Sequence, residues 1–88
     1  MKKLHFLIIG SNSFSGSHFV DHLLSLGHNV VGISRSKNMN NIFLPYKKNK
    51  NIKNFVFFKI DLNVDKDNDK IISLIKQFKI SHVVNFAA

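Results

Sequence analysis

The sequence contains no cysteine. This absence excludes disulfide bonds and thiolate chemistry, and it fits a protein of the reducing cytoplasm. The sequence also has no apolar run near the roughly 20 residues that a membrane-spanning helix requires. Its first residues, MKKLHFLIIG, place lysines before apolar residues as a signal peptide does, but the apolar run is only about six residues long and ends at Gly10. We therefore expect a first strand there, no membrane partner and a cytoplasmic location.

Acidic residues are few, with 5 Asp and Glu against 13 Lys and Arg, so the formal net charge is +8. Clustered positive charge is typical of nucleic-acid binding, because basic side chains release counterions from phosphates. The lysines here are scattered among asparagines, as in the run from Lys47 to Lys53. This arrangement favours a solvated surface and no nucleic-acid partner. The competing hypothesis, DNA binding through these lysines, predicts an affinity that falls steeply with salt.

Apolar periodicity predicts alternating strands and helices in the first part of the chain. Residues 3–9 form a short apolar run that suits a buried parallel strand, and a helix with an apolar face follows. Gly27 ends this helix, and the β-branched residues 29–33 form a second strand, which completes a βαβ unit. The apolar face of the helix consists of Phe19, Val20, Leu23, Leu24 and the flanking Leu26.

The second part of the chain continues the same alternation. Polar residues dominate from 34 to 54, which predicts a loop with at most one helical turn near residues 42–44. Residues 55–60 form a third strand and residues 82–86 a fourth, and apolar spacing between them predicts a helix over residues 68–79. The candidates for its N-terminal cap are Asp65, Asp67 and Asn68.

The segment IIGSNSFSGSHFV, residues 8–20, joins the first strand to the first helix. A helix N-terminus presents unpaired N–H groups and the positive end of a dipole, and small residues let a pyrophosphate approach that backbone. Gly10 fits the glycine that makes the tight turn, and Gly16 fits the glycine that lets the helix pack on the strand. Ser13 takes the middle position, where its hydroxyl can donate to a phosphate oxygen. In its βαβ context this turn predicts a dinucleotide site.

Three stretches together resemble the extended short-chain dehydrogenase/reductase family. These are GSNSFSGSHFVDHLLSLGHNVVGISRS, FFKIDLN and HVVNFAA, which occur in the family's order and extend over essentially the whole chain. The nearest members in the resemblance are the GDP-mannose and dTDP-glucose 4,6-dehydratase-like enzymes. The resemblance implies an α/β fold: a Rossmann-type, doubly wound parallel sheet whose first four strands have the order 3-2-1-4, with two helices.

The resemblance also implies a cofactor, a substrate and a mechanism. NAD(P)⁺ would take a hydride transiently from a nucleotide sugar, and the resulting ketone would permit epimerisation or elimination. The full-length protein would be a homodimer. Residues 1–88 would be the amino-terminal part of the NAD(P)-binding domain, with the catalytic and substrate-binding parts outside this chain. The implied cofactor-binding residues are Gly10, Ser13, Phe14, Ser15, Gly16, Ser34, Arg35, Asp61, Leu62, Ala87 and Ala88.

Ser34 and Arg35 favour NADP over NAD. NAD sites usually place an acidic residue at the end of the second strand, whereas NADP sites replace it and bring an arginine to the 2′-phosphate. Ser34 takes the acidic position and Arg35 follows it.

The chain departs from the family pattern at three places. Ser13 replaces the middle glycine, Asn85 stands where many members carry histidine, and the catalytic Tyr-x-x-x-Lys pair is absent. Tyr46 and Lys50 have that spacing, but they lie in the predicted polar loop after the second strand, so we regard the match as chance. We therefore predict no catalytic residue in this chain. The alternative function is a non-catalytic NAD(P)-binding module or a redox sensor.

No metal site is predicted. His18 and His22 have i, i+4 spacing, but Phe19 replaces the glutamate of the H-E-x-x-H motif, so surface histidines are the better interpretation. Asp65, Asp67 and Asp69 alternate as in a calcium loop but lack its glycine and its terminal glutamate, which favours helix capping.

Overall fold

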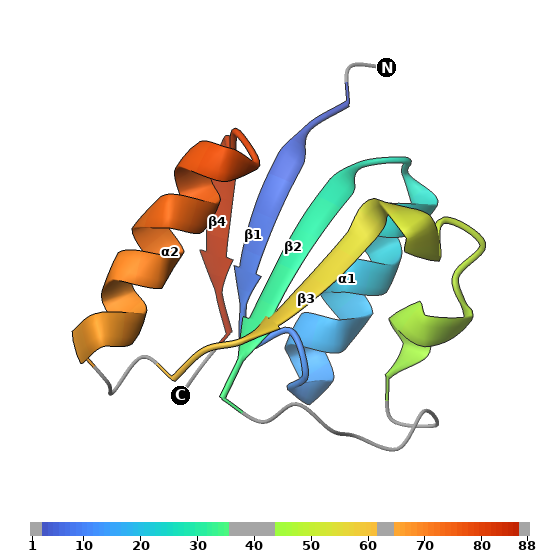
Figure 1. The fold of residues 1–88 in the computed structure, drawn as a ribbon. Helices are drawn as coiled ribbons and strands as arrows, with labels where there is room; N and C mark the ends of the chain where they lie inside the picture. The colour runs from blue at the N-terminus through green and yellow to red at the C-terminus, as the bar shows by residue number, and fades with distance from the viewer. Residues whose placement is uncertain (1–2, 36–43, 62–64, 87–88) are drawn as a thin grey trace.

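Four parallel strands form a single sheet in the computed structural model, which describes residues 3–35, 44–61 and 65–86. The strand order is β3-β2-β1-β4, so the predicted order 3-2-1-4 is confirmed (Figure 1). The predicted strand positions are also confirmed, with ends that differ by one or two residues. The strands are β1 (His5–Ile9), β2 (Asn29–Ser34), β3 (Phe55–Lys59) and β4 (His82–Asn85).

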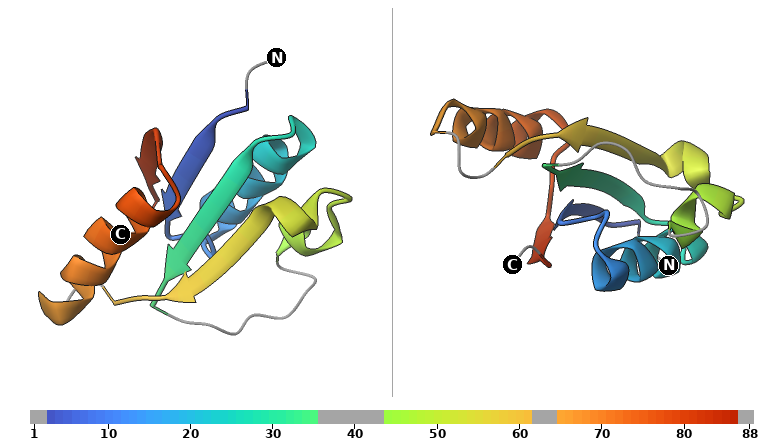
Figure 2. Two further views of the ribbon diagram at one scale, coloured as in Figure 1. Left: turned by 45° about the horizontal axis from the view of Figure 1, so that its top comes forward. Right: turned by 90° about the horizontal axis from the view of Figure 1, so that it is seen from below.

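Two helices cover opposite faces of the sheet, as the right-hand view of Figure 2 shows. Helix α1 (Phe14–Ser25) follows β1, and helix α2 (Asp65–Gln77) connects β3 to β4. None of the helices in the described part of the chain is long and apolar enough to cross a membrane.

The central strands are apolar on both sides because each face of the sheet packs against a helix. Phe6, Ile8 and Val30 belong to a cluster with Val20, Leu23 and Leu24 of α1. Their neighbours Leu7, Val31 and Ile33 belong to a second cluster with Leu74 of α2. Successive side chains of a strand point to opposite faces, so the continuous apolar runs in the sequence supply both clusters.

Helix α1 ends as predicted at Gly27, which has a φ of +88°. Its N–H donates to the Leu24 carbonyl at 2.9 Å, and the N–H of His28 donates to the Leu23 carbonyl at 3.1 Å. These two bonds form a Schellman motif, which closes the helix and turns the chain into β2. Leu26, which we placed on the apolar face, is 44% exposed, because it is the C-cap residue and lies beyond the last helical turn.

Helix α2 begins at Asp65, three residues earlier than the predicted residue 68. The interpretation of Asp65, Asp67 and Asn68 as cap candidates is therefore wrong, because Asp65 is the first residue of the helix and the other two lie further inside it. Acidic residues are stabilised in a first helical turn by the helix dipole, so a polar stretch there does not mark the end of the loop.

The segment from residue 44 to 54 is more ordered than a polar loop. It contains two short 3₁₀ helices, η2 (Pro45–Lys48) and η3 (Ile52–Asn54). Leu44 and Tyr46 are only 1% and 3% exposed and belong to the cluster on the α1 side of the sheet. The description of Tyr46 as a residue of a polar loop is therefore wrong. The predicted turn at residues 42–44 lies mostly outside the described residues.

Candidate dinucleotide-binding site

The carboxyl ends of the four strands lie at one edge of the sheet, because all the strands are parallel. Ile9 pairs with Ile33 of β2 and with Asn85 of β4, and Ser34 pairs with Lys59 of β3. The arrowheads in Figure 1 accordingly point to the same end. The segments that follow the strands meet at this edge, which is where open α/β sheets bind ligands. The predicted residues brought together there are Gly10, Ser13, Phe14, Ser15, Gly16, Ser34, Arg35 and Asp61; Leu62, Ala87 and Ala88 lie outside the described residues.

Gly10 makes the turn that leaves β1. Its φ is +83°, a left-handed conformation that side chains other than glycine adopt at a cost. The N–H groups of Gly10 and Ser11 both donate to the Ile33 carbonyl, at 2.8 and 3.1 Å. These bonds fix the turn against the end of β2.

Gly16 lies where the start of α1 touches this turn. A β-carbon on Gly16 would collide with the Gly10 carbonyl oxygen and would lie 2.8 Å from Ser13 Oγ. Only glycine allows the helix to begin this close to the strand end, which is the role of the third glycine in dinucleotide turns.

Ser13 is the N-cap residue of α1. Its Oγ donates to the Gly10 carbonyl at 2.8 Å and accepts from the Gly16 N–H at 3.0 Å. Its backbone is extended, with φ −72° and ψ 164°, which any residue can adopt. In this structure the hydroxyl proton of Ser13 is donated to the turn itself, so Ser13 holds the loop in shape.

Two N–H groups at the start of α1 find no hydrogen-bond acceptor within the described residues. The first four N–H groups of a helix lack intrahelical acceptors. The N–H of Ser13 donates to Gly10, that of Gly16 donates to Ser13 Oγ, and the intrahelical ladder starts with Ser17. This leaves the N–H groups of Phe14 and Ser15 at the positive end of a helix whose first turn carries no acidic residue. Such an end attracts anionic groups.

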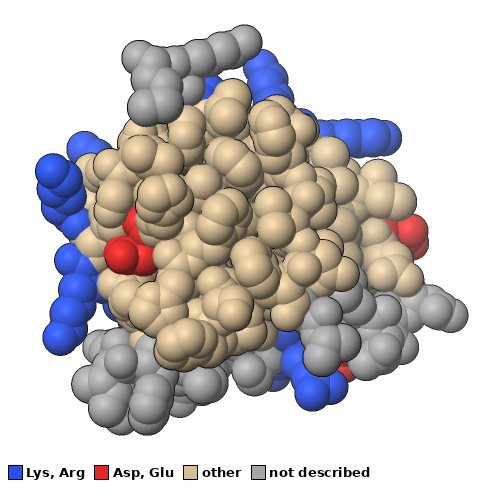
Figure 3. Space-filling model, turned by 180° about the vertical axis from the view of Figure 1, so that it is seen from behind, with Lys and Arg blue, Asp and Glu red and all other residues tan. Residues whose placement is uncertain are grey.

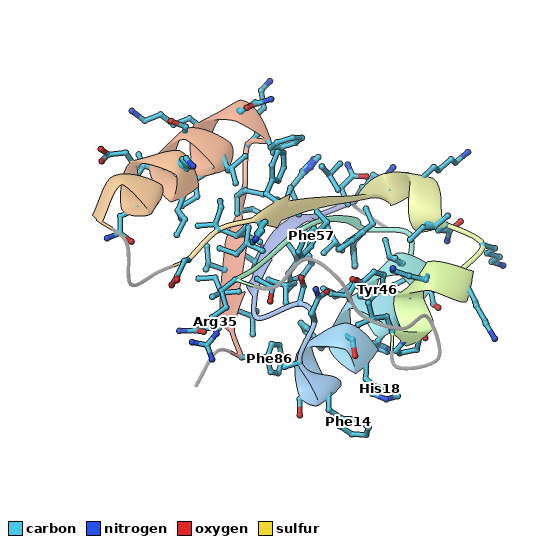
Figure 4. The ribbon with its side chains drawn as sticks, turned by 60° about the horizontal axis from the view of Figure 1, so that its bottom comes forward. Phe14, His18, Arg35, Tyr46, Phe57 and Phe86 are labelled. Carbon is cyan, nitrogen blue, oxygen red and sulfur yellow. The ribbon has the colours of Figure 1, made fainter. Side chains whose placement is uncertain are left out.

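Aromatic side chains flank the helix start. Phe14 is 79% exposed, and its ring centroid lies 4.6 Å from that of His18, on the outer surface of α1 (Figure 4). The ring of Phe86, which follows β4, packs against Phe19 at 5.6 Å. His18 and His22 are both exposed, as predicted. Within the described ranges no group of three or more metal-binding residues comes together.

Ser34, Arg35 and Asp61 lie beyond the ends of β2 and β3. Ser34 is half-buried, and its carbonyl accepts the N–H of Ile60 at 2.9 Å. Arg35 is exposed at the same edge as the glycine turn, as Figure 4 shows, and Asp61 is half-buried.

Tyr46 and Lys50, which have the spacing of the Tyr-x-x-x-Lys pair, lie in different surroundings. The Tyr46 hydroxyl donates to Asn12 Oδ1 at 2.7 Å, and Lys50 is exposed. Burial raises the pKa of Tyr46 to about 12, whereas a catalytic tyrosine needs a lowered pKa. The chance interpretation of the spacing fits these facts. The contact between Tyr46 and the glycine turn was not predicted; its only signal in the sequence is a tyrosine after Leu44 and Pro45 in a polar stretch.

Comparison with known proteins gives consistent matches. A family model described as GDP-mannose 4,6 dehydratase matches residues 7–88. The bifunctional protein GAL10 of Pachysolen tannophilus is 33% identical over 84 residues, which are 96% of this chain and 12% of that protein.

Two solved structures share the fold. The UDP-glucose 4-epimerase of Stenotrophomonas maltophila, solved with bound NAD and formylated UDP-arabinopyranose, is 25% identical with a TM-score of 0.77. The match covers 97% of this chain and 24% of the epimerase. A variant of ElxO with NADPH bound is 22% identical with a TM-score of 0.78, over 99% of this chain and 36% of ElxO. This chain thus spans a small part of each of these proteins.

Proposed function

Because the chain belongs to the GDP-mannose 4,6-dehydratase family of extended short-chain dehydrogenases/reductases, we propose that it forms the amino-terminal part of an NAD(P)-binding domain. The observation that carries this proposal is the turn from Gly10 to Gly16. It combines a left-handed glycine, a contact that excludes a β-carbon, and two N–H groups at a helix N-terminus that find no acceptor among the described residues. N–H groups at the start of a helix, next to a glycine turn, are the backbone arrangement that binds a pyrophosphate in dinucleotide sites.

In this proposal, the segments that follow the four strands contact different parts of the cofactor. The backbone of Phe14 and Ser15 would hold the pyrophosphate, and Ser34 and Arg35 would face the adenosine ribose. Asp61 and Leu62 would lie near the adenine, and Ala87 and Ala88 beside the cofactor after β4. When bound, a nicotinamide dinucleotide supplies a reversible hydride acceptor.

The whole protein would act on a nucleotide sugar by transient oxidation of the sugar. The names of the epimerase and of the dehydratase family support this substrate class. The residues of this chain bind and orient the cofactor, since the chain contains no Tyr-x-x-x-Lys pair except the buried Tyr46 with Lys50. The coding sequence beyond Ala88 tests the hypothesis that the whole protein is an enzyme. A Tyr-x-x-x-Lys pair there supports it, and a stop codon would favour a non-catalytic module.

We favour NADP as the cofactor. A carboxylate at the end of β2 would repel a 2′-phosphate, whereas Ser34 offers a hydroxyl and the exposed Arg35 offers paired charge-assisted hydrogen bonds.

Calorimetric titration with NADP⁺ and NAD⁺ tests the binding proposal. We expect the purified protein to bind at least one of them, and we expect Gly16→Ala to abolish binding because its β-carbon meets the Gly10 carbonyl. Gly27→Ala is the matched control: its β-carbon would meet nothing within 4 Å, and its φ of +88° makes the substitution costly to stability at the other end of α1, away from the site. The proposal fails if the parent protein binds neither cofactor, or if both variants bind equally well.

A further inference from the structure

A buried hydrogen bond connects the glycine turn to a segment that follows β2. The Tyr46 hydroxyl donates to Asn12 Oδ1 at 2.7 Å across 34 positions of sequence. Tyr46 is 3% exposed and Asn12 is 9% exposed, so water competes little for this bond. A hydrogen bond shielded in this way specifies geometry, because both groups lose more when it breaks than they would at the surface.

Tyr46 is held firmly on its own side. Its ring packs against the ring of Phe55 at a centroid distance of 4.5 Å. The segment that carries it is tied to α1 by Asn49, whose amide donates to the carbonyl and the carboxylate of Asp21 at 3.0 and 2.8 Å. The amide of Asn51 also donates to the Leu24 carbonyl, at 2.7 Å. Tyr46 is therefore a fixed point from which the glycine turn can be held.

Asn12 lies in the middle of the turn, between its two other anchors. Before it, Gly10 and Ser11 are bonded to the Ile33 carbonyl. After it, Ser13 caps α1 and links Gly10 to Gly16. Figure 4 shows the Tyr46 side chain directed toward the beginning of α1 from the segment that follows β2. The Tyr46 bond is thus a third restraint on the part of the turn that precedes the N–H groups of Phe14 and Ser15.

We propose that Tyr46 is a positioning residue for the dinucleotide, which acts through Asn12 to hold the glycine turn in its binding geometry. Tyr46 does not touch the cofactor. It keeps the turn in one conformation before binding, so the turn loses less conformational entropy when the pyrophosphate binds. This proposal rests on the proposed function, since it concerns the same site.

Tyr46→Phe tests the proposal, because it removes the hydroxyl and keeps the ring that packs on Phe55. We expect the Kd for the dinucleotide to rise about five- to tenfold, as the loss of one buried hydrogen bond implies. Without cofactor, we expect the amide hydrogens of Ser13 and Gly16, which are hydrogen-bonded within the turn, to exchange faster. Asn51→Ala is the control: it removes a bond of the same segment near the other end of α1, so it should lower the melting temperature and leave the Kd within about twofold.

A double-variant cycle with Asn12→Ala separates action through Asn12 from a general loss of stability. We expect Tyr46→Phe to change the Kd little when Asn12 is already alanine. An undiminished effect in that background overturns the proposal, as does an unchanged Kd in Tyr46→Phe or an equal loss in Asn51→Ala. If the parent protein binds no dinucleotide, the proposed function fails instead.

Discussion

The Tyr46 hydroxyl retains its proton more firmly in the folded protein than in the unfolded chain. Burial raises its pKa from 10.0 to about 12. The unfolded chain loses this proton first as the pH rises, so the protein's stability falls between pH 10 and pH 12 and is unaffected by this group below pH 10. A difference of two pH units corresponds to about 3 kcal/mol of unfolding free energy.

This effect can be measured on one side chain, because Tyr46 is the only tyrosine. We expect its ultraviolet absorbance to titrate near pH 12 in the folded protein and near pH 10 in urea. Denaturation curves of Tyr46→Phe at increasing pH should lack the part of the stability loss that is due to the tyrosine. A folded-state titration near pH 10 would contradict the burial argument.

Arg35 gives the second prediction at the scale of a residue. If its guanidinium binds the 2′-phosphate, Arg35→Ala should weaken NADP binding by roughly tenfold or more, since a charge-assisted hydrogen bond contributes about 1.5 to 3 kcal/mol. The affinity for NAD should stay nearly level, because NAD has no phosphate at that position. Calorimetric titration with both cofactors decides the point. Equal losses for both, or no loss for either, would remove Arg35 from the 2′-phosphate site.

At the scale of secondary-structure elements, the strands and helices could be predicted from the sequence, because their positions depend on the spacing of apolar residues. The four strands and both helices followed from runs such as residues 55–60 and from the helical recurrence around Leu23. The C-terminal end of α1 followed from Gly27, whose positive φ has a direct signal in the residue type. These features are local, so a single sequence contains them.

The features that the sequence did not predict depend on partners far along the chain. The segment from residue 44 to 54 is polar, yet Asn49 and Asn51 use their amides to bind α1, which neither composition nor periodicity indicates. The Ser13 hydroxyl donates to the Gly10 carbonyl, a local side-chain contact that the residue type alone did not indicate. The start of α2 was misplaced because acidic residues are common both before a helix and in its first turn.

At the scale of the whole molecule, the positive charge is spread rather than gathered. Figure 3 shows Lys and Arg side chains around the rim of the face that it presents, with uncharged surface in the middle. We expect only weak binding to duplex DNA at low salt, lost as salt rises, because a scattered rim neutralises few phosphates at once. Filter binding over a salt series measures this. A tight complex that survives physiological salt would instead support nucleic-acid recognition.

Because Tyr46 is hydrogen-bonded to Asn12, its intrinsic fluorescence can report on the glycine turn. The chain has one tyrosine and no tryptophan, so its intrinsic fluorescence comes from a single phenol that lies one hydrogen bond from the glycine turn. Any ligand or substitution that shifts the turn changes the surroundings of that emitter directly. Ligand binding at the site can thus be followed by the intensity and lifetime of the Tyr46 emission, without a label. No other residue of this sequence fluoresces appreciably when tyrosine is excited.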